Sequence, residues 1–288
     1  MKRIVLCLAV IALYLAAAVF GEVQCRRARA ADVTPAYNVV DSAYRNRPPL
    51  TRIPAHESGG VRLPARRAWL GTDSLGRDVL LRVVQGARIA FHVGIVTSLV
   101  AVPLGALLGL LAGWRGRAVD AFLCMLAAVF ASIPSVLLVL AMAMVVGRGL
   151  LGIYIGISLA TWVGVFRNVR AETMRQRDLG YVLSARALGY GGGRILFRHI
   201  LPNVAHVILV TFSLRFPAAV GTEVFLSFLG IGVRDDPSWG VMINNARVRL
   251  WQGVWWEGAA VTIAIFGLVL SFNLLGDLIR DRLDPRAG

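Results

Sequence analysis

The chain has 288 residues, of which 57% are hydrophobic, and a formal net charge of +15. Its mean hydropathy of +0.67 is well above that of ordinary soluble domains. In a soluble protein this charge would suggest nucleic-acid binding, but no recognised nucleic-acid motif is present and the arginines sit mostly between apolar runs. Composition therefore predicts a membrane protein that contacts anionic lipid headgroups and binds no nucleic acid.

Six segments are apolar enough and long enough to cross a bilayer, which takes about 20 residues of helix. They are residues 4–20, 89–114, 121–147, 149–166, 204–229 and 254–275. The second and third are longer than one crossing, so we expect each to tilt or to project beyond the bilayer. The sequence predicts an all-α membrane protein with six transmembrane helices.

Orientation is predicted from the basic residues of the polar segments, because short basic loops resist translocation. Basic residues precede the first span, follow the second, and are concentrated in the loop 167–203 after the fourth. That loop has two acids and seven arginines, namely Arg167, Arg170, Arg175, Arg177, Arg186, Arg194 and Arg198. With six crossings these segments share one side, so we expect both termini in the cytoplasm.

The spans divide the chain into four parts. These are a first transmembrane helix, an extracytoplasmic segment, a core transmembrane domain and a cytoplasmic tail, at residues 1–21, 22–88, 89–276 and 277–288. The start also resembles a secretory signal, because Lys2-Arg3 and an apolar run lead to Ala28-Arg29-Ala30. That run is longer than the apolar part of a typical signal, so we expect the first helix to be retained.

The predicted extracytoplasmic segment changes character along its length. Residues 22–67 have no sustained apolar period and are expected to be irregular. From Ala68 to Phe91, apolar residues recur at helical spacing with charged residues between them, which predicts an amphipathic helix at the membrane surface. Thr72 and Asp73 are typical of residues that cap the start of such a helix.

Two ionisable residues, Arg215 and Glu223, lie within the fifth predicted span. Charge is costly in lipid, so such residues are functional candidates. They stand two helical turns apart around Pro217, too far for a good direct ion pair. We expect them either to pair with a neighbouring helix or to line a translocation path.

Catalytic and metal chemistry find no support in the motifs. A nucleotide-binding Walker A loop needs Gly-Lys followed by Ser or Thr. Lys2 is the only lysine, and it stands between Met1 and Arg3. The four histidines are scattered and no H-E-x-x-H motif occurs. We expect no catalytic residue, metal or cofactor on this chain, so any ATP would bind to another polypeptide.

The basic loop has a pattern of its own, YVLSARALGYGGGRILFRHILPN, from Tyr181 to Asn203. It predicts a short helix over 181–188, a turn at Gly189, and a second helical run that Leu201-Pro202 ends. Glycine is suited to the turn because it tolerates the left-handed backbone of a helix C-cap.

The chain resembles the peptide/nickel branch of ABC importer permeases, specifically the second permease subunit of di- and oligopeptide systems. The resemblance rests on GTDSLGRDVLLRVVQGARIAFHVG, the loop YVLSARALG…RHILPN, FLSFLGIGV…PSWG and FNLLGDLIRDRLDP, which occur in family order between about residues 70 and 286. It implies the type I permease fold of the methionine importer, a place in the bacterial inner membrane, and import of di- or oligopeptides.

The family's coupling loop has Glu-Ala-Ala, a glycine four positions after the second alanine, and then Leu-Pro. Ala185 matches the second alanine, Gly189 the glycine, and Leu201-Pro202 the ending, whereas Leu183 and Ser184 occupy the glutamate and first-alanine positions. Loss of that glutamate removes a potential ionic contact to the ATPase. Glu223 resembles a family position before the LSFLG run, and Arg215 matches none.

The resemblance also implies partners: a homologous permease, two ATPase subunits that bind ATP, and an extracytoplasmic solute-binding protein. Two alternatives stay open from the residues. An ion-coupled secondary transporter would also be a multi-span protein, but it would be expected to show internal repeats with interrupted helices. The solute could also be nickel or another peptide-like compound.

Overall fold

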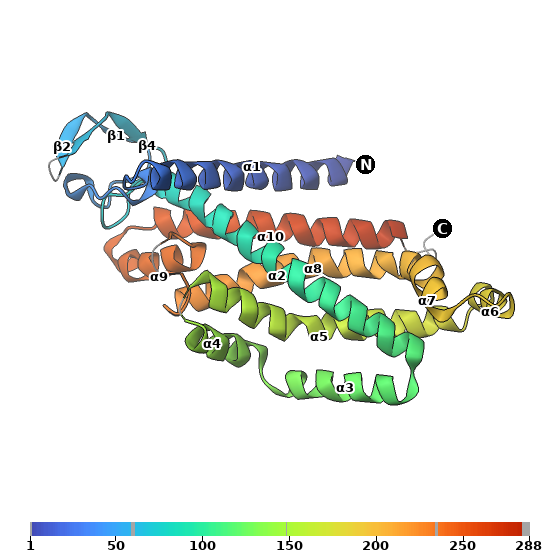
Figure 1. The fold of residues 1–288 in the computed structure, drawn as a ribbon. Helices are drawn as coiled ribbons and strands as arrows, with labels where there is room; N and C mark the ends of the chain where they lie inside the picture. The colour runs from blue at the N-terminus through green and yellow to red at the C-terminus, as the bar shows by residue number, and fades with distance from the viewer. Residues whose placement is uncertain (1, 59–60, 148, 234–235, 284–288) are drawn as a thin grey trace. The chain divides into compact units, whose positions relative to one another are not determined.

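The computed structural model describes residues 2–58, 61–147, 149–233 and 236–283 (Figure 1). It is mostly helical. The helices are α1 (Lys2–Ala30), α2 (Val79–Arg115), α3 (Arg117–Ser132), α4 (Ser135–Val145), α5 (Leu150–Arg177), α6 (Gly180–Ala187), α7 (Gly192–Ile195), α8 (Leu201–Phe228), α9 (Trp239–Arg249) and α10 (Trp256–Leu283). Short 3-10 turns occupy Ala36–Asn38, Ser42–Tyr44 and Leu250–Gln252, and a π-helical turn joins α7 to α8 at Leu196–Ile200.

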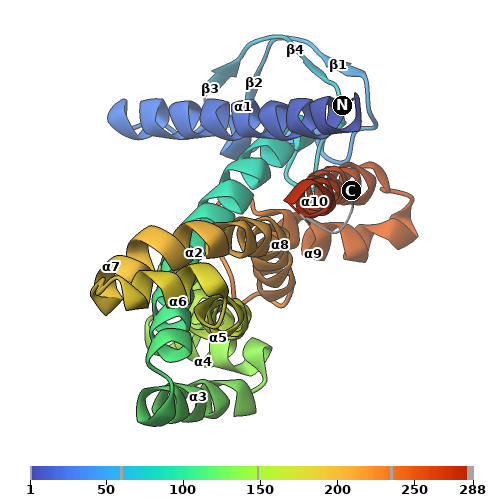
Figure 2. The same ribbon diagram turned by 90° about the vertical axis from the view of Figure 1, so that its right-hand side faces the viewer.

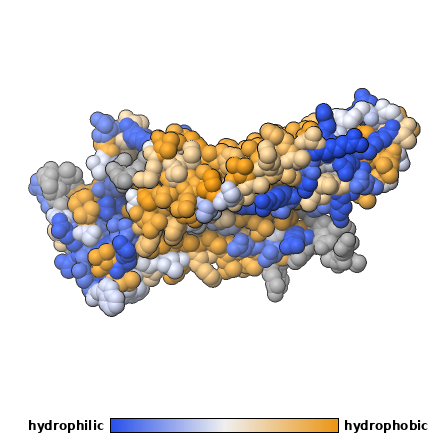
Figure 3. All heavy atoms as spheres, turned by 90° about the horizontal axis from the view of Figure 1, so that it is seen from below, coloured by the Kyte–Doolittle hydropathy of each residue, from blue (hydrophilic) through white to orange (hydrophobic). Residues whose placement is uncertain are grey.

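Among the described residues, five helices are long and apolar enough to cross a membrane, and α3 with α4 makes a sixth if the pair is one span. Much of the helical surface visible in Figure 3 is hydrophobic, as expected of helices that lie in lipid. The all-α prediction is confirmed. The last residues of the predicted tail, 284–288, lie outside the described residues.

The third predicted span, residues 121–147, is not one helix. It breaks between α3 and α4, which are bent by 82°. Ile133 at the break has an extended backbone, with φ −89° and ψ 125°. The cause is Pro134, because a proline ring disfavours helical geometry in the residue before it. The segment is therefore two helices with a sharp bend and not the single continuous helix that was expected.

The segment after the first span also differs from the prediction. Helix α1 continues to Ala30, well past Phe20. Further on, β1 (Thr51–Ile53) pairs antiparallel with β4 (Arg66–Ala68), and β2 (His56–Ser58) with β3 (Val61–Leu63). The expectation of an irregular segment is therefore wrong for parts of 22–67. The helix continues past Phe20, although polar residues follow, because one side of α1 still buries small residues as far as Ala28.

No separate amphipathic helix precedes the second span. Helix α2 begins at Val79 and runs without interruption to Arg115. Asp78 caps it, because its Oδ1 accepts hydrogen bonds from the backbone N–H groups of Leu80 (2.9 Å) and Leu81 (3.2 Å). The charged residues Arg82 and Arg88 are buried rather than exposed on a polar face, so the surface-helix prediction was wrong.

The chain forms two compact units, to which α2, α8 and α10 each contribute part of their length. Unit 1 comprises Met1–Val93, Arg148–Leu150 and Val220–Ser271. Within it, α1 buries Cys7, Ala18, Gly21, Cys25 and Ala28, of which the last four recur at spacings of three and four. The Tyr14 hydroxyl donates a hydrogen bond to the Ala264 carbonyl at 2.8 Å, which joins α1 to α10.

Unit 2 comprises Gly94–Gly147, Leu151–Ala219 and Phe272–Gly288. Its central contact is between α2 and α5, along Gly105, Gly109 and Gly113. A Cβ atom at these positions would lie 2.6, 2.8 and 2.9 Å from the backbone oxygens of Trp162, Phe166 and Arg170. Only glycine allows such a close approach, in the manner of the small-residue interfaces of membrane helices.

We expect Gly109→Leu to destabilise unit 2, because the new side chain would overlap the backbone of α5. Overpacking of this kind costs about 1–3 kcal/mol. The measurement is thermal unfolding of the purified protein in detergent. Gly221→Ala in α8 is the matched control, since nothing lies within 4 Å of its added Cβ. Equal melting temperatures for both variants would contradict the close approach of α2 and α5.

Candidate functional site

The basic loop folds into a compact helical element between α5 and α8. Figures 1 and 2 show α6 and α7 side by side, where α5 ends and α8 begins. One side of this element is buried in unit 2: Val182 and Ala185 of α6 pack with Ile195, Ile200 and Leu110 in one hydrophobic cluster. The cluster also takes in Val169 of α5 and Val204 of α8. Packing against three long helices therefore holds the loop in place.

The turn at Gly189 is as predicted. Its backbone φ is +76°, in the left-handed region. The Gly189 N–H donates to the Arg186 carbonyl at 2.9 Å, and the Tyr190 N–H donates to the Ala185 carbonyl at 3.1 Å. These bonds supply donors to carbonyls at the end of α6, which have no partner within the helix itself. The short helix itself spans Gly180–Ala187 rather than 181–188.

The predicted end of the second helical run was wrong. Leu201-Pro202 does not stop the helix, because α8 begins at Leu201 directly after the π-helical turn. Pro202 has no N–H to donate to the Arg198 carbonyl, and its ring would clash there in a regular α-helix. The wider turn resolves this: the Leu201 N–H bonds to the Leu196 carbonyl, five residues back.

The other side of the loop is exposed and largely apolar. Leu183 is 52% exposed, Leu188 74% and Phe197 57%, and Ser184 is exposed beside them. Tyr190 is also exposed, stacks on His199 and lies under the Arg194 guanidinium. We call Tyr181, Leu183, Leu188, Tyr190 and Phe197 the loop patch. Exposed apolar side chains among arginines are typical of a protein-binding surface.

Polar contacts secure the edges of the loop. The Tyr181 hydroxyl donates to Gln176 Oε1 at 2.8 Å and accepts from Asn203 Nδ2 at 3.3 Å. These bonds connect the start of α6 with the end of α5 and the start of α8. Partial burial raises the pKa of the Tyr181 hydroxyl. The Arg186 guanidinium lies 4.6 Å from the ring centroid of Trp114, at the end of α2.

The structure places the two predicted intramembrane residues in different surroundings. Glu223 is 1% exposed, accepts a 2.6 Å hydrogen bond from Ser227, and also bonds to Ser238 at the start of α9. It thus makes a helix-packing contact within unit 1. Arg215 belongs to unit 2 and lies against Gly164 of α5. A role for either residue in translocation stays a prediction.

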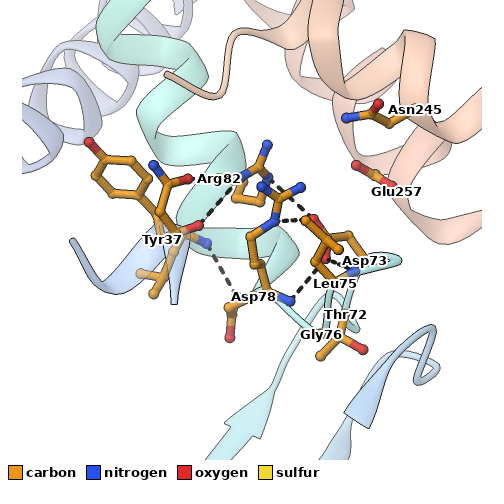
Figure 4. A network of polar contacts seen from close by, with 12 residues as sticks. Tyr37, Thr72, Asp73, Leu75, Gly76, Asp78, Arg82, Asn245 and Glu257 are labelled. Carbon is orange, nitrogen blue, oxygen red and sulfur yellow. Dashed lines mark hydrogen bonds and ion pairs between the residues drawn. The ribbon is translucent and has the colours of Figure 1, made fainter. Parts of the chain in front are cut away.

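A buried charge network that the sequence did not predict occupies unit 1 (Figure 4). Asp73 accepts hydrogen bonds from the backbone of Leu75 and Arg77, both at 2.9 Å, and from Arg77 Nε at 2.7 Å. Arg82 Nε lies 3.6 Å from the same carboxylate. Asp73 is 1% exposed and Arg82 3%, so these charges are mutually compensated in the interior.

The same region joins the segment before α2 to α9 and α10, through Asn46 and Thr72. Arg249 Nη2 donates to Glu257 Oε2 at 2.7 Å, and Arg249 Nη1 donates to Asn46 Oδ1 at 3.4 Å. The Trp256 indole N–H donates to the Thr72 carbonyl at 3.0 Å. An acid at the start of an apolar helix, such as Glu257, was the available signal for this network. Its partner could not be identified without the fold.

Among the described residues, no group of three His, Cys, Asp or Glu side chains is arranged to hold a metal ion. The site is therefore one of surfaces and helix contacts: an exposed apolar loop patch on a buried base, joined to several membrane-spanning helices. The helical fold and its apolar spans define a multi-span membrane protein. Residues 105–288 match the family model described as "Binding-protein-dependent transport system inner membrane component", and the chain belongs to this family. It is a multi-pass membrane permease subunit of an ABC importer.

Its relatives include named transport proteins. The chain is 36% identical over 227 residues to the oligopeptide transport system permease protein OppC of Bacillus subtilis (strain 168), covering 77% of this chain and 73% of that protein. It is 39% identical to the glutathione transport system permease protein GsiD of Pectobacterium atrosepticum, with coverages of 77% and 74%. It is 35% identical to the di/tripeptide transport system permease protein DppC of Pseudomonas aeruginosa, with coverages of 76% and 73%.

The fold is similar to that of a solved transporter. An inward-facing structure of the MetNI methionine ABC transporter aligns with a TM-score of 0.54 and 18% sequence identity, over 71% of this chain and 96% of that chain. This confirms the predicted type I permease fold.

Removing one member of the Arg249–Glu257 pair should destabilise unit 1. Glu257→Leu leaves the buried arginine without its partner, a loss of about 3–5 kcal/mol. The double change Arg249→Met with Glu257→Leu should recover much of it, because neither charge then remains. Thermal unfolding in detergent measures both. The exposed pair Arg175–Glu172 is the control, and Arg175→Ala should cost under about 1 kcal/mol. A double variant no more stable than Glu257→Leu would contradict the proposed pairing.

Proposed function

We propose that this permease imports di- or oligopeptides and that the loop 167–203 couples it to a separate ATPase subunit. The observation that carries the coupling assignment is the two-sided loop. Val182 and Ala185 are buried on one side of α6, and Leu183 is exposed on the other. A partner that pushes on the loop patch thus moves α2, α5 and α8 together, because the buried side is packed against all three. The relatives' names support peptides as the solute.

The energy source lies on other polypeptides. Lys2 is the only lysine, and no Walker A loop can be formed around it. ATP therefore binds to two ATPase subunits at the cytoplasmic face, and this chain has no ATPase site and binds no cofactor. A homologous permease completes the path, and an extracytoplasmic solute-binding protein delivers the peptide. ATP-driven closure of the ATPases moves the coupling loops and reorients the helices, in an alternating-access cycle.

Leu183 replaces the glutamate of the family's pattern, which changes the chemistry of the contact. An apolar, half-exposed side chain at this position suits an apolar pocket on the ATPase better than a basic one. Family membership also decides against an ion-coupled secondary transporter. Nickel chelates or other peptide-like solutes are the alternatives that a binding assay with the solute-binding protein would reveal.

Gly189→Val should abolish uptake without affecting membrane insertion. Valine is strained at a φ of +76°, so α6 would end differently and the loop patch would be misplaced. Nothing lies within 4 Å of an added Cβ, so the effect is one of backbone geometry and not of packing. We expect the ATPase to be lost on co-purification, and substrate-stimulated ATP hydrolysis to fall with it.

Two comparisons make this experiment specific. Gly193→Ala, also in the loop and also with open space around its Cβ, should behave like the wild type. Leu183→Glu restores the family's residue. It should weaken docking to the apolar pocket proposed here, whereas tolerated or stronger docking would show that the ATPase has a basic site instead. Normal ATP hydrolysis and uptake in Gly189→Val would mean that this loop does not couple the subunits.

The proposed orientation places the loop 167–203 in the cytoplasm and the connection between α9 and α10 outside. We expect Trp251→Cys to react with a membrane-impermeant thiol reagent in intact cells, and Asp178→Cys to react only after the cells are opened. Both positions are well exposed, at 95% for Trp251 and 73% for the Asp178 side chain. The background should lack Cys7, Cys25 and Cys124. Labelling of Asp178→Cys in intact cells would reverse the topology.

A further inference from the structure

Arg215 is a charged residue within a membrane-spanning helix. It lies in the segment Gly192–Phe228, which is long and apolar enough to cross the bilayer. Its side chain is only partly buried. Among the described residues, no carboxylate forms an ion pair with it, since the acids of unit 2 that form ion pairs, Asp120, Glu172 and Asp178, are bound to other arginines. A cation at this depth needs a partner or water, because exposure to lipid is costly.

The neighbouring helix makes room for this guanidinium. Gly164 of α5 lies directly under it: a Cβ atom there would overlap Nη2 and would approach Cζ to 2.9 Å. The absence of a side chain at Gly164 therefore lets the Nη2 end of the guanidinium reach the surface of α5. The arginine is thus accommodated by a second element, rather than simply pointing away from α8.

The side of α5 on which Arg215 lies is itself polar. Thr161, Gly164 and Asn168 stand three and four residues apart and so share one side of the helix. Thr161 and Gly164 are partly exposed and Asn168 is exposed. The Thr161 hydroxyl donates to the Ile157 carbonyl at 2.7 Å, which leaves its oxygen free to accept a hydrogen bond. We call Thr161, Gly164, Asn168 and Arg215 the α5–α8 polar strip. Polar residues in spanning helices belong to protein interiors or water-filled cavities.

We propose that the α5–α8 polar strip lines the translocation path and that Arg215 binds a carboxylate of the solute in transit. This inference rests on the proposed peptide-import function. Arginine presents a planar fork that can hold a carboxylate with two parallel hydrogen bonds. A peptide has such a group at its carboxyl terminus. The amide of Asn168 supplies a further donor on the same strip. The site thus binds the carboxylate that all peptides share and does not discriminate between their side chains.

Aqueous access is the first test. In a background lacking Cys7, Cys25 and Cys124, Arg215→Cys in the purified complex in proteoliposomes should react with a cationic methanethiosulfonate reagent. Leu209→Cys is the control: Leu209 is 57% exposed on α8, carries an apolar side chain, and lies outside the strip. We expect it to react at least tenfold more slowly. An unreactive Arg215→Cys would overturn the inference, because the position would then be closed to water.

Transport is the second test, with radiolabelled trialanine and its carboxyl-terminal amide as probes in proteoliposomes that contain the whole complex and its binding protein. Arg215→Gln should lower trialanine uptake about tenfold or more, which corresponds to a lost charge-assisted hydrogen bond. Arg215→Lys should retain more uptake, since it keeps the charge without the fork. The wild type should take up the amide poorly, and Arg215→Gln should not lower that uptake further.

Three outcomes would overturn the inference in distinguishable ways. Equal trialanine uptake by the wild type and Arg215→Gln would contradict the carboxylate site but not the proposed peptide import. Loss of the second permease from purified Arg215→Gln would show that Arg215 pairs with a carboxylate of that subunit instead. A wild type that takes up no trialanine would remove the peptide assignment, and this inference with it.

Discussion

The close approach of α2 and α5 is the contact on which the rest of unit 2 depends. Gly105, Gly109 and Gly113 bring backbone against backbone, so the two helices act as one rigid pair. In lipid there is little hydrophobic drive between helices, and dispersion contacts over a close-fitting surface must supply the attraction. The same pair ends at Gly113, whose carbonyl accepts a 2.9 Å hydrogen bond from Arg177 Nη1.

The loop 167–203, for which we propose the coupling role, is built on this pair. Ala106 and Leu110 of α2 alternate with the glycines and face the cluster that contains Val182, Ala185 and Ile195. The loop therefore contacts the side of α2 adjacent to the glycine seam. A displacement of the loop reaches α5 and α8 through packed side chains, with no flexible linker between them. Such contiguous packing is what the coupling of ATP hydrolysis to helix movement requires.

Unit 1 differs from unit 2 in that it buries several charged side chains. Asp73, Arg82, Arg249 and Glu257 are all buried, and each has an oppositely charged neighbour. Such networks are weak evidence for stability, because desolvation offsets much of the attraction. Their neighbours nevertheless join the segment before α2 to the helices after it, since Asn46 bonds to Arg249 of α9 and Thr72 to Trp256 of α10. These contacts indicate that the network positions the segment before α2.

Periodicity and composition by themselves determined the all-α class, the approximate spans and the turn at Gly189, because apolar length and a glycine at a helix end are local properties. The family was indicated by the resemblance of several motifs and their order. Periodicity and composition failed where a distant contact or a backbone constraint decided the outcome. Arg82 and Arg88 were expected on a polar helix face, but the fold buries both. Arg82 lies beside Asp73, whereas Arg88 pairs with Asp236, which is remote in sequence. Pro134 breaks a span, whereas Pro202 is absorbed by a π-helical turn. The tertiary structure alone showed that Arg215 lies on Gly164, since no local pattern relates two residues on separate helices.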